Sequence, residues 1–235
     1  MKFAIIAAGE GSRLAQEGVS LPKPLVSIGG EPMIERLVRI FNANGAEEVV
    51  IIINTLHPQT EAHLRHRISE GWGSNVRLVV KSTPSSMHSF HELSAYLQDA
   101  PFCLTTVDTI FREDDFSAYI RAFQHSEADG MMAVTDFVDD EKPLWVGTDK
   151  EMNITGFHDT CEDDTFISGG IYCLKPNTLS TLHRCMSEGQ SRMRNFQRAL
   201  VADGWQLRAY RLGKILDVDH VGDIEKAEAF LASAD

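Results

Sequence analysis

Residues 3–14 read FAIIAAGEGSRL, six apolar residues followed directly by a glycine-rich loop. A continuous apolar run of this length is typical of a strand buried on both faces of a parallel sheet. Ligands of such sheets bind beyond the carboxyl ends of the strands. Glycine lets backbone N–H groups approach phosphate oxygens closely. We therefore predict that this loop binds phosphate, through Ala8, Gly9, Gly11 and Ser12.

The remainder of residues 1–130 alternates between buried-strand and helical patterns. Strands are expected at 48–53, 76–80 and 102–107, and helices at 32–44, 58–69, 87–97 and 116–125. This alternation predicts an α/β fold with a mostly parallel sheet and helices on both faces.

The pattern changes after Gly130, where the apolar, strand-like segments become shorter. Strands are expected at 131–137, 144–147, 154–158, 167–174, 205–210 and 215–218, and helices at 178–186, 192–202 and 221–232. The chain shows no linker, repeat or low-complexity tract. We therefore expect a single domain over 1–235, with a nucleotide-binding half (1–130) and a second half (131–235) that adds another wall to the site.

The net charge excludes some classes of partner. The 235 residues include 22 Lys and Arg and 34 Asp and Glu, which gives −12 at pH 7. Such a balance argues against a protein that binds nucleic acid or an anionic membrane surface. Residues 101–165 alone contain 4 basic and 16 acidic residues, which accounts for the whole imbalance. The phosphate-binding edge is therefore close to neutral.

Several features predict a cytoplasmic protein. The apolar run at residues 3–8 is too short for a signal peptide and ends in glycines and charges. No run approaches the roughly 20 apolar residues that span a bilayer. The four cysteines lack CxxC spacing and are sparse for a secreted disulfide scaffold, so we expect them to be reduced.

The glycine loop departs from the common phosphate-binding motifs. A dinucleotide fingerprint would have a third glycine where Leu14 stands and an immediate helix, and a P-loop would end in Gly-Lys-Ser/Thr. Here the loop runs on to Pro22-Lys23-Pro24-Leu25, where two prolines disfavour helix. We predict a long open loop in which Arg13 and Lys23 hold a triphosphate, Arg as a planar fork and Lys as a point charge.

Three segments together resemble a known family. They are residues 7–14 (AAGEGSRL), 22–25 (PKPL) and 29–34 (GGEPMI), and their order and spacing are similar to the opening of the nucleotidyltransferases that act on sugar phosphates. The resemblance implies a Rossmann-like, mostly parallel mixed sheet of the nucleotide-diphospho-sugar transferase type. It also implies transfer of an NMP group from an NTP to a phosphomonoester, most often a sugar 1-phosphate, with release of pyrophosphate. Arg13, Lys23 and Asp108 would then be catalytic.

Acidic residues supply candidate ligands for Mg²⁺, the cofactor that the resemblance implies. Asp108 ends the apolar run 102–107, at the same sheet edge as the glycine loop. The segment 216–224 (LDVDHVGDI) resembles the late acidic segment of the family, and in a strand Asp217 and Asp219 would share one face. Mg²⁺ commonly binds one or two carboxylates together with substrate phosphates. Either Asp217 or Asp219 is therefore the expected second ligand, with Asp217 slightly favoured.

The expected acceptor side is Ser168-Gly169-Gly170, which resembles the sugar-binding run of the family; a glycine bulge in a buried strand is the alternative. Two departures leave the base and the acceptor open. Residues 81–89 (KSTPSSMHS) replace the usual Leu-Gly-Thr-Ala-like turn, although this Ser/Thr-rich loop, with His88 and His91 beside it, is placed to line the nucleotide pocket. Residues 156–160 (GFHDT) lack the lysine that binds the sugar phosphate in many members, and Glu141-Lys142-Pro143 lies too early to replace it.

Other functions remain as alternatives. They are a non-catalytic nucleotide-sugar-binding protein, a phosphocholine- or molybdopterin-type nucleotidyltransferase, and a nucleotide-sugar glycosyltransferase, which would need a DxD motif after the fourth strand. The expected partners are an NTP and a small phosphorylated acceptor, with no nucleic acid and no membrane, and an oligomer is compatible with the sequence.

Overall fold

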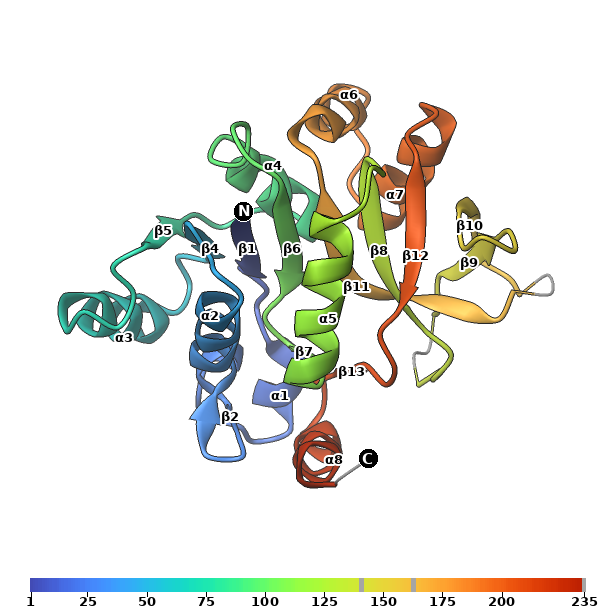
Figure 1. Ribbon diagram of the computed structural model, residues 1–235. Helices are drawn as coiled ribbons and strands as arrows, with labels where there is room; N and C mark the ends of the chain where they lie inside the picture. The colour runs from blue at the N-terminus through green and yellow to red at the C-terminus, as the bar shows by residue number, and fades with distance from the viewer. Residues whose placement is uncertain (140–141, 162–163, 234–235) are drawn as a thin grey trace.

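A nine-stranded mixed sheet forms the centre of the protein (Figure 1). The computed structural model describes residues 1–139, 142–161 and 164–233. The strand order is β10-β9-β11-β6-β1-β4-β5, with β8 beside β11 and β12 beside β8. The strands are β1 (Lys2–Ala7), β4 (Val49–Ile53), β5 (Val76–Val80), β6 (Phe102–Thr106), β8 (Gly130–Thr135), β9 (Trp145–Thr148), β10 (Ile154–His158), β11 (Phe166–Leu174) and β12 (Leu207–Arg211).

The first half of the sheet is parallel. β1 pairs with β4 and β6, and β4 pairs with β5, all in parallel register. The nine-residue strand β11 then runs antiparallel to β6, β8 and β9. The carboxyl ends of β1, β4 and β6 therefore meet at one edge, and the loops that follow them lie side by side. The mixed sheet with a parallel nucleotide-binding half confirms the predicted fold class.

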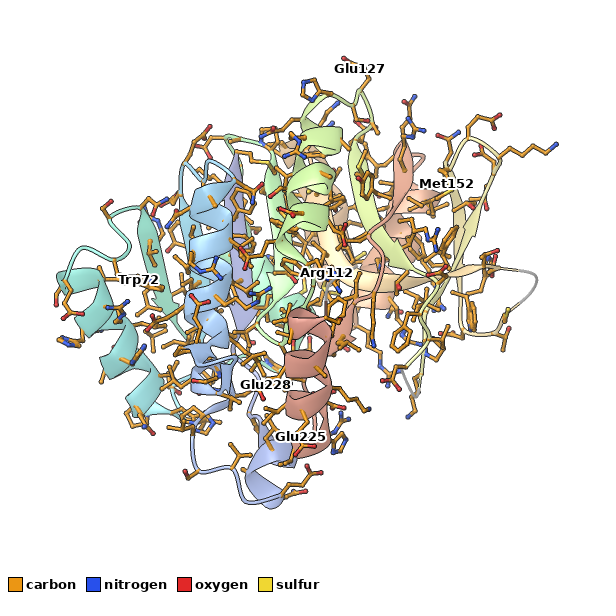
Figure 2. The ribbon with its side chains drawn as sticks, turned by 60° about the horizontal axis from the view of Figure 1, so that its bottom comes forward. Trp72, Arg112, Glu127, Met152, Glu225 and Glu228 are labelled. Atoms are coloured by element: carbon orange, nitrogen blue, oxygen red, sulfur yellow. The ribbon has the colours of Figure 1, made fainter. Side chains whose placement is uncertain are left out.

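Helices cover both faces because alternate side chains of the buried strands point to opposite sides. Phe3 and Ile5 pack into one core with α2 (Met33–Ala43), α5 (Glu113–Gln124) and α8 (Val221–Ala232). Ala4 and Ile6 pack into the other with α4 (Ser86–Ser94), α6 (Leu179–Ser187) and α7 (Met193–Ala202). Figure 2 shows α2 and α5 side by side, with α8, which carries Glu225 and Glu228, below them. α3 (Pro58–Ser69) lies at the β5 edge near Trp72. None of the helices in the described ranges is long and apolar enough to cross a membrane.

The expected open loop after β1 is partly helical, so that prediction was wrong. A short helix, α1 (Ser12–Gln16), follows the glycines directly, and its Leu14 is buried in the first core. Lys23–Leu25 form a 3₁₀ turn in which the N–H of Leu25 donates to the carbonyl of Pro22. Proline resists the interior of an α-helix, but its fixed φ suits the first positions of a helical turn.

Two short antiparallel ribbons were not predicted as pairs. β2 (Ser27–Ile28) pairs with β3 (Glu31–Pro32). β7 (Thr109–Ile110) pairs with β13 (Leu216–Asp217), which brings the C-terminal acidic segment beside Asp108. The expected strand 215–218 is shorter than predicted and ends at Asp217. The alternation that was to place Asp217 and Asp219 on one face of a strand therefore does not extend to Asp219.

Tyr119 joins α5 to the centre of the sheet. Its buried hydroxyl donates to the carbonyl of Met131 (2.6 Å) and accepts from the N–H of Cys173 (3.0 Å). These strands, β8 and β11, pair with each other. Because both backbone groups are buried, removing the hydroxyl leaves them without this partner.

We expect Tyr119→Phe to lower the free energy of unfolding by about 1–3 kcal/mol, the usual cost of unsatisfied buried polar groups. Denaturant unfolding followed by circular dichroism measures the change. Tyr210→Phe is the matched control, because its ring lies 5.4 Å from that of Tyr119 and its hydroxyl bonds to no described residue. Equal losses in the two variants would contradict the role assigned to the Tyr119 hydroxyl.

Candidate active site

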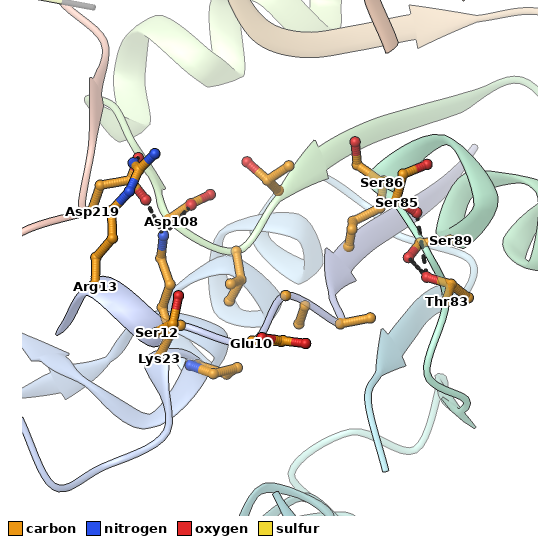
Figure 3. Close-up of a pocket in the computed structure, with 18 of the residues that line it drawn as sticks. Glu10, Ser12, Arg13, Lys23, Thr83, Ser85, Ser86, Ser89, Asp108 and Asp219 are labelled. Atoms are coloured by element: carbon orange, nitrogen blue, oxygen red, sulfur yellow. Dashed lines mark hydrogen bonds and ion pairs between the residues drawn. The ribbon is translucent and has the colours of Figure 1, made fainter. Parts of the chain in front are cut away.

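A pocket of about 540 Å³ lies beyond the carboxyl ends of β1 and β6 (Figure 3). It contains every residue predicted to bind nucleotide, from the end of β1 through α1 to Lys23: Ala8, Gly9, Gly11, Ser12, Arg13 and Lys23. Asp108 and Asp219 also line it. The predicted phosphate-binding residues therefore lie in one cavity at the edge of the parallel half-sheet.

Gly11 is required by the shape of the loop. Its φ of 63° lies in the left-handed region, which side chains with a Cβ rarely adopt. A Cβ at this position would also lie 3.0 Å from the Cβ of Lys23. Gly9 differs, because a Cβ there would meet nothing within 4 Å. Gly11 thus permits the turn and brings the backbone against Lys23.

Asn54, which the sequence analysis did not select, anchors the glycine loop. It follows β4 and is 4 % exposed. Its side-chain amide donates to the carbonyls of Ala8 (3.3 Å) and Gly9 (2.8 Å), and its oxygen accepts from the N–H groups of Leu56 and His57. The Nε2 of His57 lies 3.0 Å from the carbonyl oxygen of Glu10. Because their carbonyls are engaged here, the loop residues are fixed in orientation around the pocket.

Lys23 lies between two carboxylates. Its Nζ is 2.5 Å from Oδ2 of Asp108 and 2.7 Å from Oδ1 of Asp219, and Nη1 of Arg13 is 2.8 Å from Oδ2 of Asp219. The side chain of Lys23 is only 12 % exposed. Burial would lower the pKa of its ammonium, but the carboxylates of Asp108 and Asp219 outweigh burial and raise that pKa. Lys23 is therefore held as a cation at the centre of the pocket.

The carboxylates near Lys23 have spare capacity for a cation. Oδ1 of Asp108 is buried and accepts no hydrogen bond from the described residues. Burial and repulsion from Asp108 and Asp219 raise the pKa of the Asp217 carboxyl. Asp217 is exposed to solvent, so we consider repulsion the stronger cause. Within the described ranges, no three His, Cys, Asp or Glu side chains converge as a complete metal site.

The opposite wall of the pocket is a row of hydroxyls at the start of α4 (Figure 3). Four side chains contribute: Thr83, Ser85, Ser86 and Ser89. Their position agrees with the interpretation of the Ser/Thr-rich loop as a lining of the nucleotide pocket. The two nearby histidines contact other side chains. Nδ1 of His88 lies 2.8 Å from Oγ of Ser85, and the ring of His91 packs edge-on against that of His183. Neither histidine is among the described residues that line the pocket.

A second pocket of about 460 Å³ meets the first at Arg13 and Asp219, which line both. Ser168, Gly169 and Asp217 line it, whereas the predicted Gly170 is not among its described lining residues. Gly170 instead has a φ of 72° at a shift in the register of β11. This conformation agrees with the glycine-bulge alternative for that residue.

Two lysines in the second pocket were missed by the sequence analysis. Lys142 precedes β9, and Lys226 extends from α8, where its Nζ lies 3.2 Å from Oδ1 of Asp223 and 3.4 Å from Oδ2 of Asp139. The segment Glu141-Lys142-Pro143 was set aside because it comes early in the chain, but the fold brings Lys142 to this pocket. Glu141 lies outside the described residues. The Glu-Lys-Pro pattern was therefore a local signal for Lys142, whereas no local signal marks Lys226, which tertiary structure alone brings to the pocket.

The family model for MobA-like NTP transferase domains matches residues 3–203. The chain belongs to this family. The matched residues include β1, the glycine loop, Lys23 and Asp108 and end before the acidic segment at 216–219. The resemblance drawn from the three opening motifs is thereby confirmed at the level of the family.

Curated relatives of this NTP transferase domain act on sugar phosphates. The chain is 26 % identical over 196 residues to a mannose-1-phosphate guanyltransferase of Yarrowia lipolytica, covering 77 % of this chain and 51 % of the relative. It is 37 % identical over 51 residues to a glucose-1-phosphate cytidylyltransferase of Salmonella typhimurium, covering 22 % of this chain and 20 % of that protein. The chain thus spans about half the length of the first of these relatives.

Solved structures show the same fold for this NTP transferase domain. A putative glucose-1-phosphate thymidylyltransferase of Bacillus anthracis has a TM-score of 0.85, over 100 % of this chain and 96 % of that chain. The inositol-1-phosphate CTP transferase of T. maritima has a TM-score of 0.77, over 99 % and 98 %. Each is 17 % identical to this chain.

We expect Asn54→Ala to weaken NTP binding about tenfold, a loss of about 1.4 kcal/mol, because the carbonyls of the glycine loop lose their anchor. Calorimetric titration with an NTP measures the affinity. Asn75→Ala is the control, since the Asn75 amide bonds to Asn42 and to the carbonyl of Ala46, away from the pocket. The anchoring role fails if both variants bind the nucleotide equally well.

Proposed function

We propose that this protein transfers an NMP group from an NTP to a sugar 1-phosphate and releases pyrophosphate. The observation that carries the proposal is the junction of two pockets at Arg13 and Asp219, with Lys23 beside it. One pocket has the glycine loop, and the other has Ser168 and two lysines. The activities of the curated relatives, which act on mannose 1-phosphate and glucose 1-phosphate, support this choice of acceptor.

In the proposed reaction an oxygen of the acceptor phosphate forms a bond to the α-phosphorus of the NTP. The bond from that phosphorus to the bridging oxygen breaks, and pyrophosphate leaves with the electron pair. A phosphate dianion is already an adequate nucleophile, so no general base is required. Phosphoryl transfer depends mainly on positioning and on charge stabilisation.

The cations at the junction would supply that stabilisation. The loop amides with Arg13 would hold the nucleotide phosphates, and Lys23 would offset the negative charge on the oxygens of the five-coordinate α-phosphate. Both cations are paired with Asp219. Incoming phosphates therefore compete with Asp219 for partners that are already in position.

The donor set fits Mg²⁺, which we include in the proposal as the cofactor. Oδ1 of Asp108, which has no hydrogen-bond partner among the described residues, would offer one oxygen ligand, and Asp217 or Asp219 would offer another. When bound, Mg²⁺ would neutralise phosphate charge, and substrate oxygens would complete its shell. The four cysteines are free thiols, three of them buried, which supports the proposed cytoplasmic location.

We expect Lys23→Ala and Asp108→Ala each to lower kcat/KM by about a hundredfold or more, the usual effect of removing a group that stabilises transition-state charge. Pyrophosphate release is measured with the four NTPs and a panel of sugar 1-phosphates, phosphocholine and other phosphomonoesters. The panel also distinguishes a sugar-phosphate enzyme from a phosphocholine-type one.

Lys175→Ala is the matched control for these variants, because Nζ of Lys175 donates to the carbonyl of Glu127, away from both pockets. Thermal unfolding tests whether each variant remains folded. Turnover within a few-fold of wild type in folded Lys23→Ala or Asp108→Ala would refute the assignment. NTP binding without pyrophosphate release from any acceptor would indicate a binding protein instead.

Metal binding should depend on pH through Asp217. A carboxyl with a raised pKa keeps its proton above the ordinary carboxyl range, and a metal must displace that proton. The affinity for Mg²⁺ is therefore expected to keep rising with pH above that range. In Asp217→Asn it should level off there, whereas in Asp219→Asn, which removes one source of the repulsion on Asp217, the rise should end at a lower pH than in wild type. Calorimetric titration at a series of pH values tests this, and identical profiles for wild type and Asp217→Asn would contradict it.

A further inference from the structure

An arginine-rich depression lies beside the second pocket, outside the site described so far. It has a volume of about 590 Å³ and is open to solvent. Three arginines from the start of α7 dominate its described lining, which consists of Lys142, Pro143, Asp159, Arg192, Arg194, Asn195 and Arg198. In a protein with a net charge of −12, a cluster of guanidinium groups is a local reversal of charge.

The described residues of the depression contain more guanidinium groups than carboxylates. Nη1 of Arg194 lies 2.6 Å from Oδ1 of Asp159, and Nη2 of Arg198 lies 2.8 Å from Oδ2 of the same carboxylate. Arg192 is exposed and has no side-chain partner within the described ranges. Two guanidinium groups thus share one carboxylate, and each also donates to a backbone carbonyl, Arg194 to Lys142 and Arg198 to Phe157. The guanidinium of Arg192 keeps all its N–H donors available among the described residues. Arginine in this setting suits bidentate binding of a phosphate or a carboxylate.

Two contacts join the depression to the second pocket. Lys142 lines both cavities. Nε2 of Gln197 on α7 donates to Oγ of Ser168, a lining residue of the second pocket, at 2.9 Å. Residues three and four apart are neighbours on a helix surface, so Arg194 lies beside both Gln197 and Arg198 on α7. Arg194 and Arg198 therefore lie within one helical turn of the residue that contacts Ser168, and Arg192 lies at the N-terminus of the same helix.

We propose that the acceptor carries a second anionic group, a phosphate or a carboxylate, which binds to Arg192, Arg194 and Arg198. This inference rests on the proposed transfer to a sugar 1-phosphate. The reacting phosphate of the acceptor lies next to Arg13, and the body of the acceptor crosses the second pocket past Ser168. The distant anionic group then meets the arginines of α7 beyond Lys142.

The test compares acceptors that differ only in a second charge. The probes are glucose 1-phosphate, glucose 1,6-bisphosphate and glucuronic acid 1-phosphate, each with the preferred NTP. We expect kcat/KM to be about tenfold or more higher for an acceptor with the second anionic group, the worth of one charge-assisted contact. Calorimetric titration of the same sugars measures their affinity without any need for turnover.

Arg192→Gln is the cleanest variant, because it removes a guanidinium with no partner among the described residues. It should abolish most of the preference for the doubly charged acceptor, and Arg194→Gln should do the same. Arg65→Gln, on α3 at the other end of the sheet, is the control and should retain the preference. A preference that survives Arg192→Gln, Arg194→Gln and their combination overturns the proposal.

The two readouts separate this inference from the proposed function. Pyrophosphate release that is equally efficient with singly and doubly charged acceptors overturns the inference and leaves the proposed function intact. Absence of turnover with every acceptor overturns the proposed function. Calorimetry then tests the inference through the ratio of the affinities for the doubly and the singly charged sugars. Inorganic phosphate that binds through these arginines, without tighter binding of the doubly charged sugars, overturns the inference in favour of a site for free anions.

Discussion

The ion pairs of Lys23 with Asp108 and Asp219 are the interaction on which the rest of the site depends. They bring three distant parts of the chain to one point: the turn after the glycine loop, the end of β6 and the segment after β13. A lysine that is 12 % exposed needs carboxylates to keep its charge. The same carboxylates are the oxygens that a divalent cation would use. These ion pairs thus join the cation that is proposed to bind phosphates to the carboxylates that are proposed to bind Mg²⁺.

The sheet explains why the two pockets are adjacent but distinct. The parallel strands β1, β4 and β6 deliver the glycine loop, Asn54 and Asp108 to one edge. β11 then runs in the opposite direction beside β6, and the shift in its register lies between Ser168 and Tyr172. The change of strand direction therefore separates the first pocket, which is lined by the glycine loop, from the second, which is lined by residues of β11. This arrangement suits the two substrates of the proposed transfer, which meet only where an oxygen of the acceptor phosphate attacks the α-phosphorus of the NTP.

Sequence patterns correctly predicted the features that depend only on residues close together in the chain. The apolar run of β1 and the two loop glycines can be recognised from their neighbours alone, and the pocket contains all the residues predicted from them. Asn54 and Lys226 could not be found in this way, because only tertiary contacts bring them to the pockets. Lys142 was noticed but set aside, because its place in the chain does not reveal that the fold brings it to the second pocket. The helical turn at Lys23–Leu25 was missed because proline excludes the interior of an α-helix but not its first turn. Asp219 was reached through the resemblance, and its pairing with two cations only through the structure.

The β7–β13 ribbon has a consequence for synthesis of the chain. β7 ends at residue 110, but its partner β13 begins only at residue 216. On the ribosome, the glycine loop and the first parallel strands are therefore available long before Asp219 emerges. Until then Arg13 and Lys23 lack one of the carboxylates that hold them in place. β12 (Leu207–Arg211), the last strand of the sheet, and Asp219 leave the tunnel almost together, so the sheet and the ion pairs of the site can be completed only when synthesis is nearly finished.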